Sequence, residues 1–218
     1  MTAEVQRAQV AGAAGAIEVA SAAPENPRSV AIIAHPHPLF GGTMDNKVVT
    51  TLARAFEESG AAAFRFNFRG VGATQGEHDE GAGETDDMLR VIEHARAMFP
   101  GLPVQLAGFS FGGAVAVRAS GAVAFSQLVL VAPGFRRFTG HGMGEAPDPA
   151  DPNLGAPGLH AAANTVIVHG DLDETVALSD SIAWATPREV PVVVVPGAEH
   201  FFHRKLAVLR AVVQRWVR

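Results

Sequence analysis

Six short stretches of this 218-residue chain are almost continuously apolar, and most are rich in β-branched residues. They are 29–35 (SVAIIAH), 61–68 (AAAFRFNF), 103–107 (PVQLA), 128–133 (LVLVAP), 165–170 (TVIVHG) and 191–197 (PVVVVPG). Runs of this length and composition are typical of strands that are buried on both faces. We therefore expect six strands inside a sheet.

The segments between these runs carry apolar residues at helical spacing instead. Segments 47–59, 86–99 and 201–218 each place a stripe of Leu, Val, Ile or Phe on one side. Thr85 is the expected N-cap of the second helix, since two aspartates follow it in the first turn, where carboxylates offset the positive end of the helix dipole. The basic residues of 201–218 fall off the apolar stripe, so we interpret them as a solvated face.

Strands that alternate with helices favour one α/β fold over the whole chain, 1–218, with a mostly parallel, twisted sheet and helices on both faces. The first 27 residues differ, because their polar and apolar residues alternate in EVQRAQV and AIEVA. That period of two predicts an N-terminal antiparallel hairpin at the sheet edge. The proline- and glycine-rich segment 133–163 has no helical period, so we expect no helical cap domain and an open pocket.

Composition narrows the classes of partner. The net charge is −5 and basic residues are scattered, which argues against a nucleic acid or an anionic membrane surface as partner. The first 20 residues lack a basic segment followed by an uninterrupted apolar one, so they do not resemble a secretory signal, and we expect a cytoplasmic protein. The chain has no cysteine, which excludes thiolate metal sites.

Chemically reactive side chains follow three of the predicted strands. Ser110 comes after 103–107, Asp171 and Asp173 come after 165–170, and His200 comes after 191–197. Because the carboxyl ends of parallel strands meet at one edge of a sheet, these residues are expected to lie close together. A serine hydroxyl needs an imidazole to accept its proton and a carboxylate to orient that imidazole. Ser110, Asp173 and His200 are our candidates for these three roles.

The nucleophile lies in GFSFGG, residues 108–113, which matches the pattern G-x-S-x-G. A sharp turn from strand to helix forces the serine into a strained conformation, and its glycines avoid clashes with the neighbouring strand and the helix. The N–H of Phe111, at the start of the following helix, is then expected to point at the oxyanion. Without its partners, Ser110 could equally be a helix-capping serine.

Other histidines offer alternative interpretations. His169 is expected to be a packed histidine that bonds to backbone, and His203 to begin the last helix. His35 and His37 begin a pattern seen in metallohydrolases, but Leu39 and Phe40 stand where that pattern needs an aspartate and a histidine. We therefore expect no metal and no cofactor.

Taken together, GFSFGG, HGDLDETV, GAEHFF, FNFRGVGATQG and HPHPLFGGTMDN resemble motifs of the α/β-hydrolase superfamily. The resemblance covers nearly the whole chain and is greatest to small, lidless serine esterase-like members akin to dienelactone hydrolases. Dienelactone hydrolases proper carry a cysteine nucleophile, whereas this chain carries serine at that position. The particular substrate of the dienelactone hydrolases is therefore not implied here.

The resemblance implies roles for further residues. Family members place the triad acid three residues after the strand-end glycine, which selects Asp173 over Asp171; Asp171 is then expected to accept N–H groups of its own turn. They take a second oxyanion donor from the loop after the third strand, which is the run 29–35 when the two strands of the hairpin are counted first. In that loop, Pro36 and Pro38 have no N–H. His37 and Leu39 are the remaining donors, and position favours His37. A plain rigid turn is the alternative.

The expected function is a serine hydrolase that cleaves small-molecule carboxylic esters through an acyl-enzyme. Phe40, Phe135 and Phe201, with Phe111, are candidate apolar walls of the pocket. Arg69, Gly70 and Gly72 are expected to fix a turn, and the loop with His78 and Glu84 to be solvated. The alternatives are a thioesterase or peptidase with the same triad, or a non-catalytic binding protein of the same fold.

Overall fold

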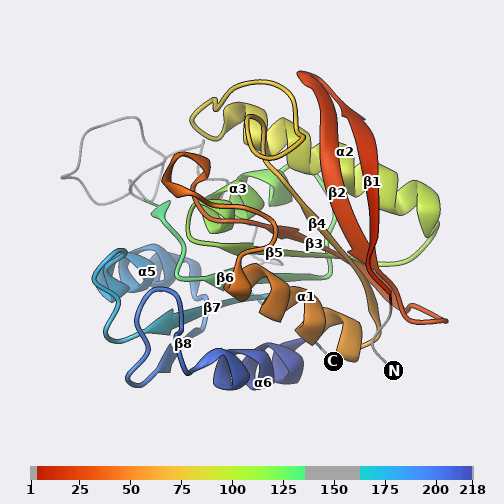
Figure 1. Cartoon of the computed structure of the whole chain (residues 1–218). Coiled ribbons are helices and arrows are strands. Elements are labelled where there is room, and N and C mark those ends of the chain that lie inside the picture. The colour runs from red at the N-terminus through yellow and green to blue at the C-terminus, as the bar shows by residue number, and fades with distance from the viewer. Residues whose placement is uncertain (1–3, 136–162, 218) are drawn as a thin grey trace.

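The predicted buried runs form the centre of one eight-stranded sheet in the computed structural model, which describes residues 4–135 and 163–217 (Figure 1). The strands are β1 (Gln6–Gly12), β2 (Gly15–Ala22), β3 (Ser29–Ala34), β4 (Ala61–Phe66), β5 (Val104–Phe109), β6 (Gln127–Val131), β7 (Thr165–Gly170) and β8 (Val192–Val195). All residues of β3, β4, β5 and β7 are buried, as continuous apolar runs predict.

The sheet has the strand order β1-β2-β4-β3-β5-β6-β7-β8. Strands β3 to β8 pair in parallel, whereas β1 pairs with β2, and β2 with β4, in antiparallel fashion. The N-terminal hairpin at the sheet edge is therefore confirmed, with Val10 opposite Ile17 in its register. Parallel pairing brings the carboxyl ends of β3, β5, β6, β7 and β8 to the same edge.

Helices cover both faces of the sheet, as predicted. One face packs against α1 (Lys47–Glu58) and α6 (Leu206–Trp216), through side chains such as Phe56 and Leu209. The other face packs against α2 (Ala82–Met98), α3 (Phe111–Ser120) and α5 (Leu178–Ala185), through side chains such as Ile92 and Trp184. Figure 1 shows the carboxyl edge on the left, beside α5 and the loop after β3.

Helix α2 begins four residues before its predicted start. Gly81, with φ of 93°, precedes the first turn, and Thr85 lies inside the helix, where its hydroxyl donates to the Gly81 carbonyl. The side chain of Glu84 accepts from the Asp79 and Gly81 N–H groups and is completely buried. The prediction of a solvated loop was therefore wrong for Glu84, which closes the turn from inside.

The expected start of the last helix was wrong. His203 lies in a turn, because α6 begins at Leu206. The open pocket was predicted from segment 133–163, of which residues 136–162 lie outside the described residues. Within the part of the chain that the structure describes, no helix is long and apolar enough to span a membrane.

Candidate active site

Ser110 occupies the sharp turn between β5 and α3. Its φ of 55° and ψ of −120° are unusual for a residue with a side chain, and backbone hydrogen bonds hold it there. Its N–H donates to the Val131 carbonyl, and its carbonyl accepts from the N–H groups of Gly113 and Gly134, each at 2.9 Å. The end of β6, the first turn of α3 and the loop after β6 thus hold the strained turn, and Ser110 is 9% exposed.

The glycines around Ser110 leave no room for a side chain. A Cβ atom at Gly108 would lie 2.0 Å from the Gly112 carbonyl oxygen, and one at Gly112 would lie 2.4 Å from the His35 carbonyl oxygen. The first turn of α3 therefore packs directly against the ends of β3 and β5. This close approach explains the residue pattern GFSFGG and agrees with the clash expected from the sequence.

His200 connects the loops after β5 and β7. Its Nε2 lies 3.1 Å from the Ser110 Oγ, and its Nδ1 lies 2.7 Å from the Asp173 Oδ2. The imidazole is 4% exposed and packs on the rings of Phe109 and Phe201. Three side chains that are up to 90 residues apart in the sequence thus form one chain of hydrogen bonds.

Asp173 uses both carboxylate oxygens. Oδ2 faces His200, and Oδ1 accepts from the N–H groups of Thr175 and Val176 at 2.9 and 2.8 Å. Burial by itself raises the pKa of Asp173, but hydrogen bonds from His169, His200 and the Val176 N–H outweigh burial and hold that pKa well below its usual range. The carboxylate is therefore ionised at neutral pH, as an acceptor for an imidazole N–H must be.

Asp171 has a different partner from the one predicted. Its Oδ1 accepts from the Gly197 N–H at 2.6 Å, so it joins the loop after β7 to the loop after β8. The expectation that it would bond within its own turn was wrong; Asp173 makes those local bonds. Asp171 thereby holds the loop that carries His200, three residues after Gly197.

The two other histidines considered from the sequence do not contact Ser110. His203 is about half exposed and pairs with Glu199 in its own turn, with 2.8 Å between Nδ1 and Oε1. His169 is fully buried and bonds to the Val176 carbonyl, as a packed histidine was expected to do. Its ring also lies 3.3 Å from Asp173 Oδ2, a contact that the sequence did not indicate.

The two backbone segments that were predicted to donate to an oxyanion lie side by side. The His37 ring packs on the Phe111 ring with 4.7 Å between centroids, and it also contacts Phe40 and His78. His35 anchors the loop: its Nδ1 bonds to the Pro36 carbonyl and its Nε2 accepts from the Phe68 N–H. Burial lowers the pKa of His35 to about 4, so this anchor is uncharged at neutral pH.

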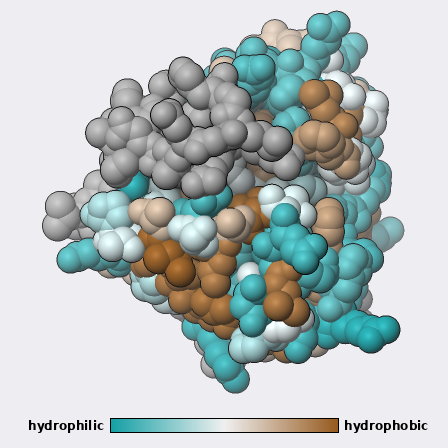
Figure 2. Space-filling view, turned by 90° about the vertical axis from the view of Figure 1, so that its left-hand side faces the viewer, coloured by the Kyte–Doolittle hydropathy of each residue, from teal (hydrophilic) through white to brown (hydrophobic). Residues whose placement is uncertain are grey.

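Large apolar side chains are exposed on the loops that surround Ser110. In the loop after β3, Leu39 is 69% exposed and Phe40 is 73% exposed; Leu172 and Phe201, in the loops after β7 and β8, are 59% and 36% exposed. Figure 2 shows this side of the molecule, where hydrophobic atoms gather in patches between polar ones. Phe135 is fully buried and stacks on Trp184, so the prediction that it forms a wall of the pocket was wrong.

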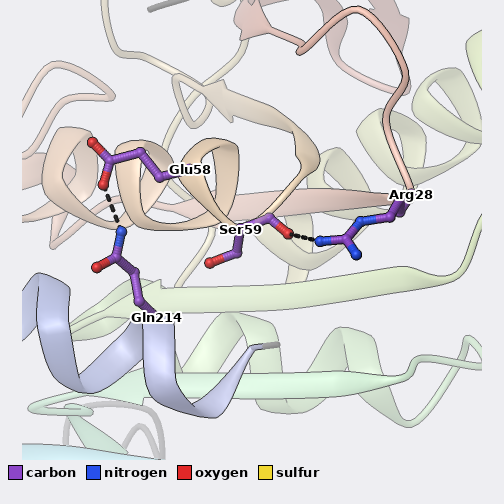
Figure 3. A pocket seen from close by; sticks show the side chains of 4 residues that line it. All are labelled: Arg28, Glu58, Ser59 and Gln214. Carbon is purple, nitrogen blue, oxygen red and sulfur yellow. Dashed lines mark hydrogen bonds between the residues drawn. The ribbon is translucent and has the colours of Figure 1, made fainter.

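A separate surface cavity lies at the opposite, amino edge of the sheet. It has a volume of about 370 Å³ and is lined by Arg28, Glu58, Ser59 and Gln214 (Figure 3). These groups bond to one another: Arg28 donates to the Ser59 carbonyl, and Gln214 donates to Glu58. Arg28 precedes β3 and Ser59 precedes β4, so this cavity is remote from Ser110.

A strained serine between a parallel strand and a helix, in contact with a histidine and an aspartate from later loops, defines an α/β-hydrolase fold of the serine hydrolase class. Residues 12–149 match the family model described as serine aminopeptidase, S33, and the chain belongs to this family. The matched residues include Ser110 but end before Asp173 and His200.

Solved structures with similar sequences have the same fold over nearly the whole chain. A lidless α/β serine hydrolase of Xanthomonas campestris is 36% identical, with a TM-score of 0.83, and the similarity covers 99% of this chain and 94% of that one. An α/β serine hydrolase homologue from Coxiella burnetii is also 36% identical, with a TM-score of 0.82 and coverage of 96% of each chain.

A dienelactone hydrolase of Anabaena variabilis shares the fold, with a TM-score of 0.78 at 16% identity over 99% of this chain and 97% of that one. An uncharacterised protein of Rickettsia prowazekii is 36% identical over 129 residues, which are 58% of this chain. This chain spans about half the length of that curated relative, 50%.

Proposed function

We propose that this protein is a serine hydrolase that cleaves carboxylic esters through an acyl-enzyme on Ser110. The observation that carries the proposal is the chain of hydrogen bonds from Ser110 through His200 to Asp173, built on a strained turn. A hydroxyl reacts near neutral pH only when a base accepts its proton, and His200 is at hydrogen-bond distance to do so.

The proposed reaction needs no group beyond the protein and water. Ser110 Oγ attacks the ester carbonyl carbon while His200 Nε2 accepts the hydroxyl proton. The N–H groups of Phe111 and His37 stabilise the oxyanion, and Asp173 stabilises the imidazolium that forms. The ester C–O bond then breaks, and the alcohol leaves with the proton from His200. A water molecule, activated by His200, hydrolyses the acyl-enzyme by the same steps.

The exposed apolar side chains around Ser110 support an ester with an apolar acyl or alcohol group. Phe201 packs against His200, and Phe40 packs against His37, so each aromatic ring contacts a residue of the proposed machinery. Burying such rings against a substrate favours binding in proportion to the apolar area removed from water. Phe40 and Phe201 are therefore our proposed contacts for the apolar group.

The description of the family as an aminopeptidase makes peptide cleavage the second candidate function. Both reactions use the same triad, so the test compares an ester, a thioester and an amide that share one acyl group. We expect kcat/KM to be highest for the ester and to vanish in Ser110→Ala. Faster cleavage of an amide with a free amino terminus would replace the esterase proposal by an aminopeptidase one.

A further inference from the structure

One buried titratable side chain at the carboxyl edge has no part in the proposed reaction. His169 lies near the end of β7, and its side chain is completely buried, as is that of Ser181 on α5. It reaches the same carboxylate oxygen as His200 does: its Nε2 is 3.3 Å from Asp173 Oδ2, compared with 2.7 Å for the Nδ1 of His200. Asp173 thus lies between two imidazoles.

The neighbours of His169 define which ring nitrogen carries a hydrogen. Nε2 faces two acceptors, the Val176 carbonyl oxygen at 3.0 Å and the carboxylate of Asp173. Nε2 must therefore be protonated, because an unprotonated nitrogen would leave three acceptors facing one another. Nδ1 lies 2.8 Å from the Ser181 Oγ, which donates its hydroxyl proton to the ring when the ring is neutral.

We propose that His169 is a positioning residue for Asp173, and that Ser181 orients His169. The inference rests on the proposed function, because it assigns His169 to the triad through the triad acid. A line of side chains then runs from α5 through His169 to Asp173, His200 and Ser110.

A buried carboxylate needs donors on both oxygens, and its position must be held to within about 0.5 Å for productive geometry. Val176 contacts both residues: its N–H donates to Asp173 Oδ1, and its carbonyl accepts from His169. The loop after β7 is thereby fastened to the end of β7 itself. Loss of the imidazole would free the Val176 carbonyl and leave Oδ2 with His200 as its side-chain donor.

The charge of Asp173 gives a measurable effect on His200 that would be absent if His169 only filled space in the core. The negative charge of Asp173 Oδ2 interacts with the imidazoles of both His169 and His200. Without the His169 donor, that charge acts on His200 alone and stabilises its protonated form. The pH at which His200 loses its proton should then rise, while the looser carboxylate should slow the attack by Ser110.

The test compares four variants. His169→Leu removes the donor and puts an apolar side chain of similar size in its place. His169→Gln replaces the Nε2 donor with an amide N–H donor. Ser181→Ala removes the group that orients the ring. Ile167→Val is the matched control, because Ile167 is a buried core residue of β7 two positions before His169 and therefore on the same face of the strand, and its apolar side chain has no donor for Asp173.

Two measurements are made on each protein: the rate at which a fluorophosphonate labels Ser110 as a function of pH, and the titration midpoint of His200 by NMR. In His169→Leu we expect labelling to slow by about 10- to 100-fold, as for misplaced catalytic groups, with both midpoints shifted to higher pH. His169→Gln should restore most of the rate and the wild-type midpoint. Ser181→Ala should show a smaller change in the same direction.

The proposal is overturned if His169→Leu keeps the wild-type rate and midpoint, or if Ile167→Val slows labelling as much as His169→Leu does. If His169→Leu does not fold, His169→Gln and Ser181→Ala provide the test in its place. The proposal is then contradicted if both of these variants lose labelling rate while their His200 midpoints stay at the wild-type value. A wild-type protein that is not labelled at Ser110 would refute the proposed function instead, and the NMR midpoints would still test the link from His169 to His200.

Discussion

At the carboxyl edge of the sheet, Ser110, His169 and His200 are at most 9% exposed and bond to side chains of other elements or loops. At the amino edge, Arg28 and Glu58 are exposed, and the bonds around the cavity of Figure 3 join surface groups of α1, α6 and the start of β3. A polar group without solvent depends on its protein partners, whereas an exposed pair exchanges them for water at little cost. The contrast indicates that substitutions at the carboxyl edge should affect reactivity far more than those at the amino edge.

The largest difference between the edges should come from the triad acid. Asp173→Asn should lower turnover by a factor on the order of 10⁴ in a protein that still folds, because an amide selects the wrong imidazole tautomer. The check is kcat on an ester that the wild type hydrolyses, with melting recorded alongside.

Asp171→Asn is the control within the same loop, and Glu58→Gln the control at the amino edge. Asp171→Asn should cost mainly stability, about 1 kcal/mol for one hydrogen bond, and Glu58→Gln should change neither quantity by much. Turnover that is lost in Asp171→Asn and kept in Asp173→Asn would reverse the assignment of the acid.

The next largest effect should come from the backbone at His37. His37→Pro removes the proposed oxyanion donor and should slow turnover by roughly 100-fold, whereas His37→Ala keeps the N–H and most of the activity. The φ of −53° at His37 already suits proline, so the loop can accept it. The kcat of both variants is the measurement, and equal, mild losses would transfer the role to Leu39.

A smaller effect concerns stability in acid. Burial lowers the pKa of His35 to about 4, below the ordinary value near 6.5, so between these two pH values the unfolded chain binds a proton that the folded one does not. The contribution of His35 to stability is therefore complete above pH 6.5 and falls by up to about 1.4 kcal/mol per pH unit as the pH drops toward 4.

Urea unfolding of the wild type and of His35→Gln at several pH values measures this slope. The variant should be less stable at pH 7, and its free energy of unfolding should fall less steeply with acid. Identical slopes in the two proteins would show that another group causes the acid sensitivity.

The sequence predicted those parts of the fold that depend on local pattern. Continuous apolar runs gave the central strands, and alternation gave the hairpin. Since parallel strands end at one edge, the order of the chain was enough to bring Ser110, Asp173 and His200 together. The start of α2 was missed because its turn closes through the buried Glu84, a contact made from inside the helix rather than by a residue before it.

Two further errors, at Asp171 and Phe135, share a cause, which is that the partner lies on another element. Asp171 bonds to Gly197 after β8, and Phe135 is buried against Trp184 of α5. His169 was correctly expected to be packed, but its contact with Asp173 depends on how the loop after β7 folds back. Spacing along a chain carries no signal for such contacts.

The central claim is that the carboxyl edge makes Ser110 a nucleophile, and labelling with a fluorophosphonate tests it most directly. The folded protein is treated with the probe at neutral pH, and the adduct is located by peptide mass spectrometry, with Ser110→Ala and His200→Ala as controls. We predict one adduct on Ser110 that is absent from Ser110→Ala and strongly reduced in His200→Ala. The absence of an adduct on folded wild-type protein, or an adduct on Ser110 that forms as fast without His200, would contradict the claim.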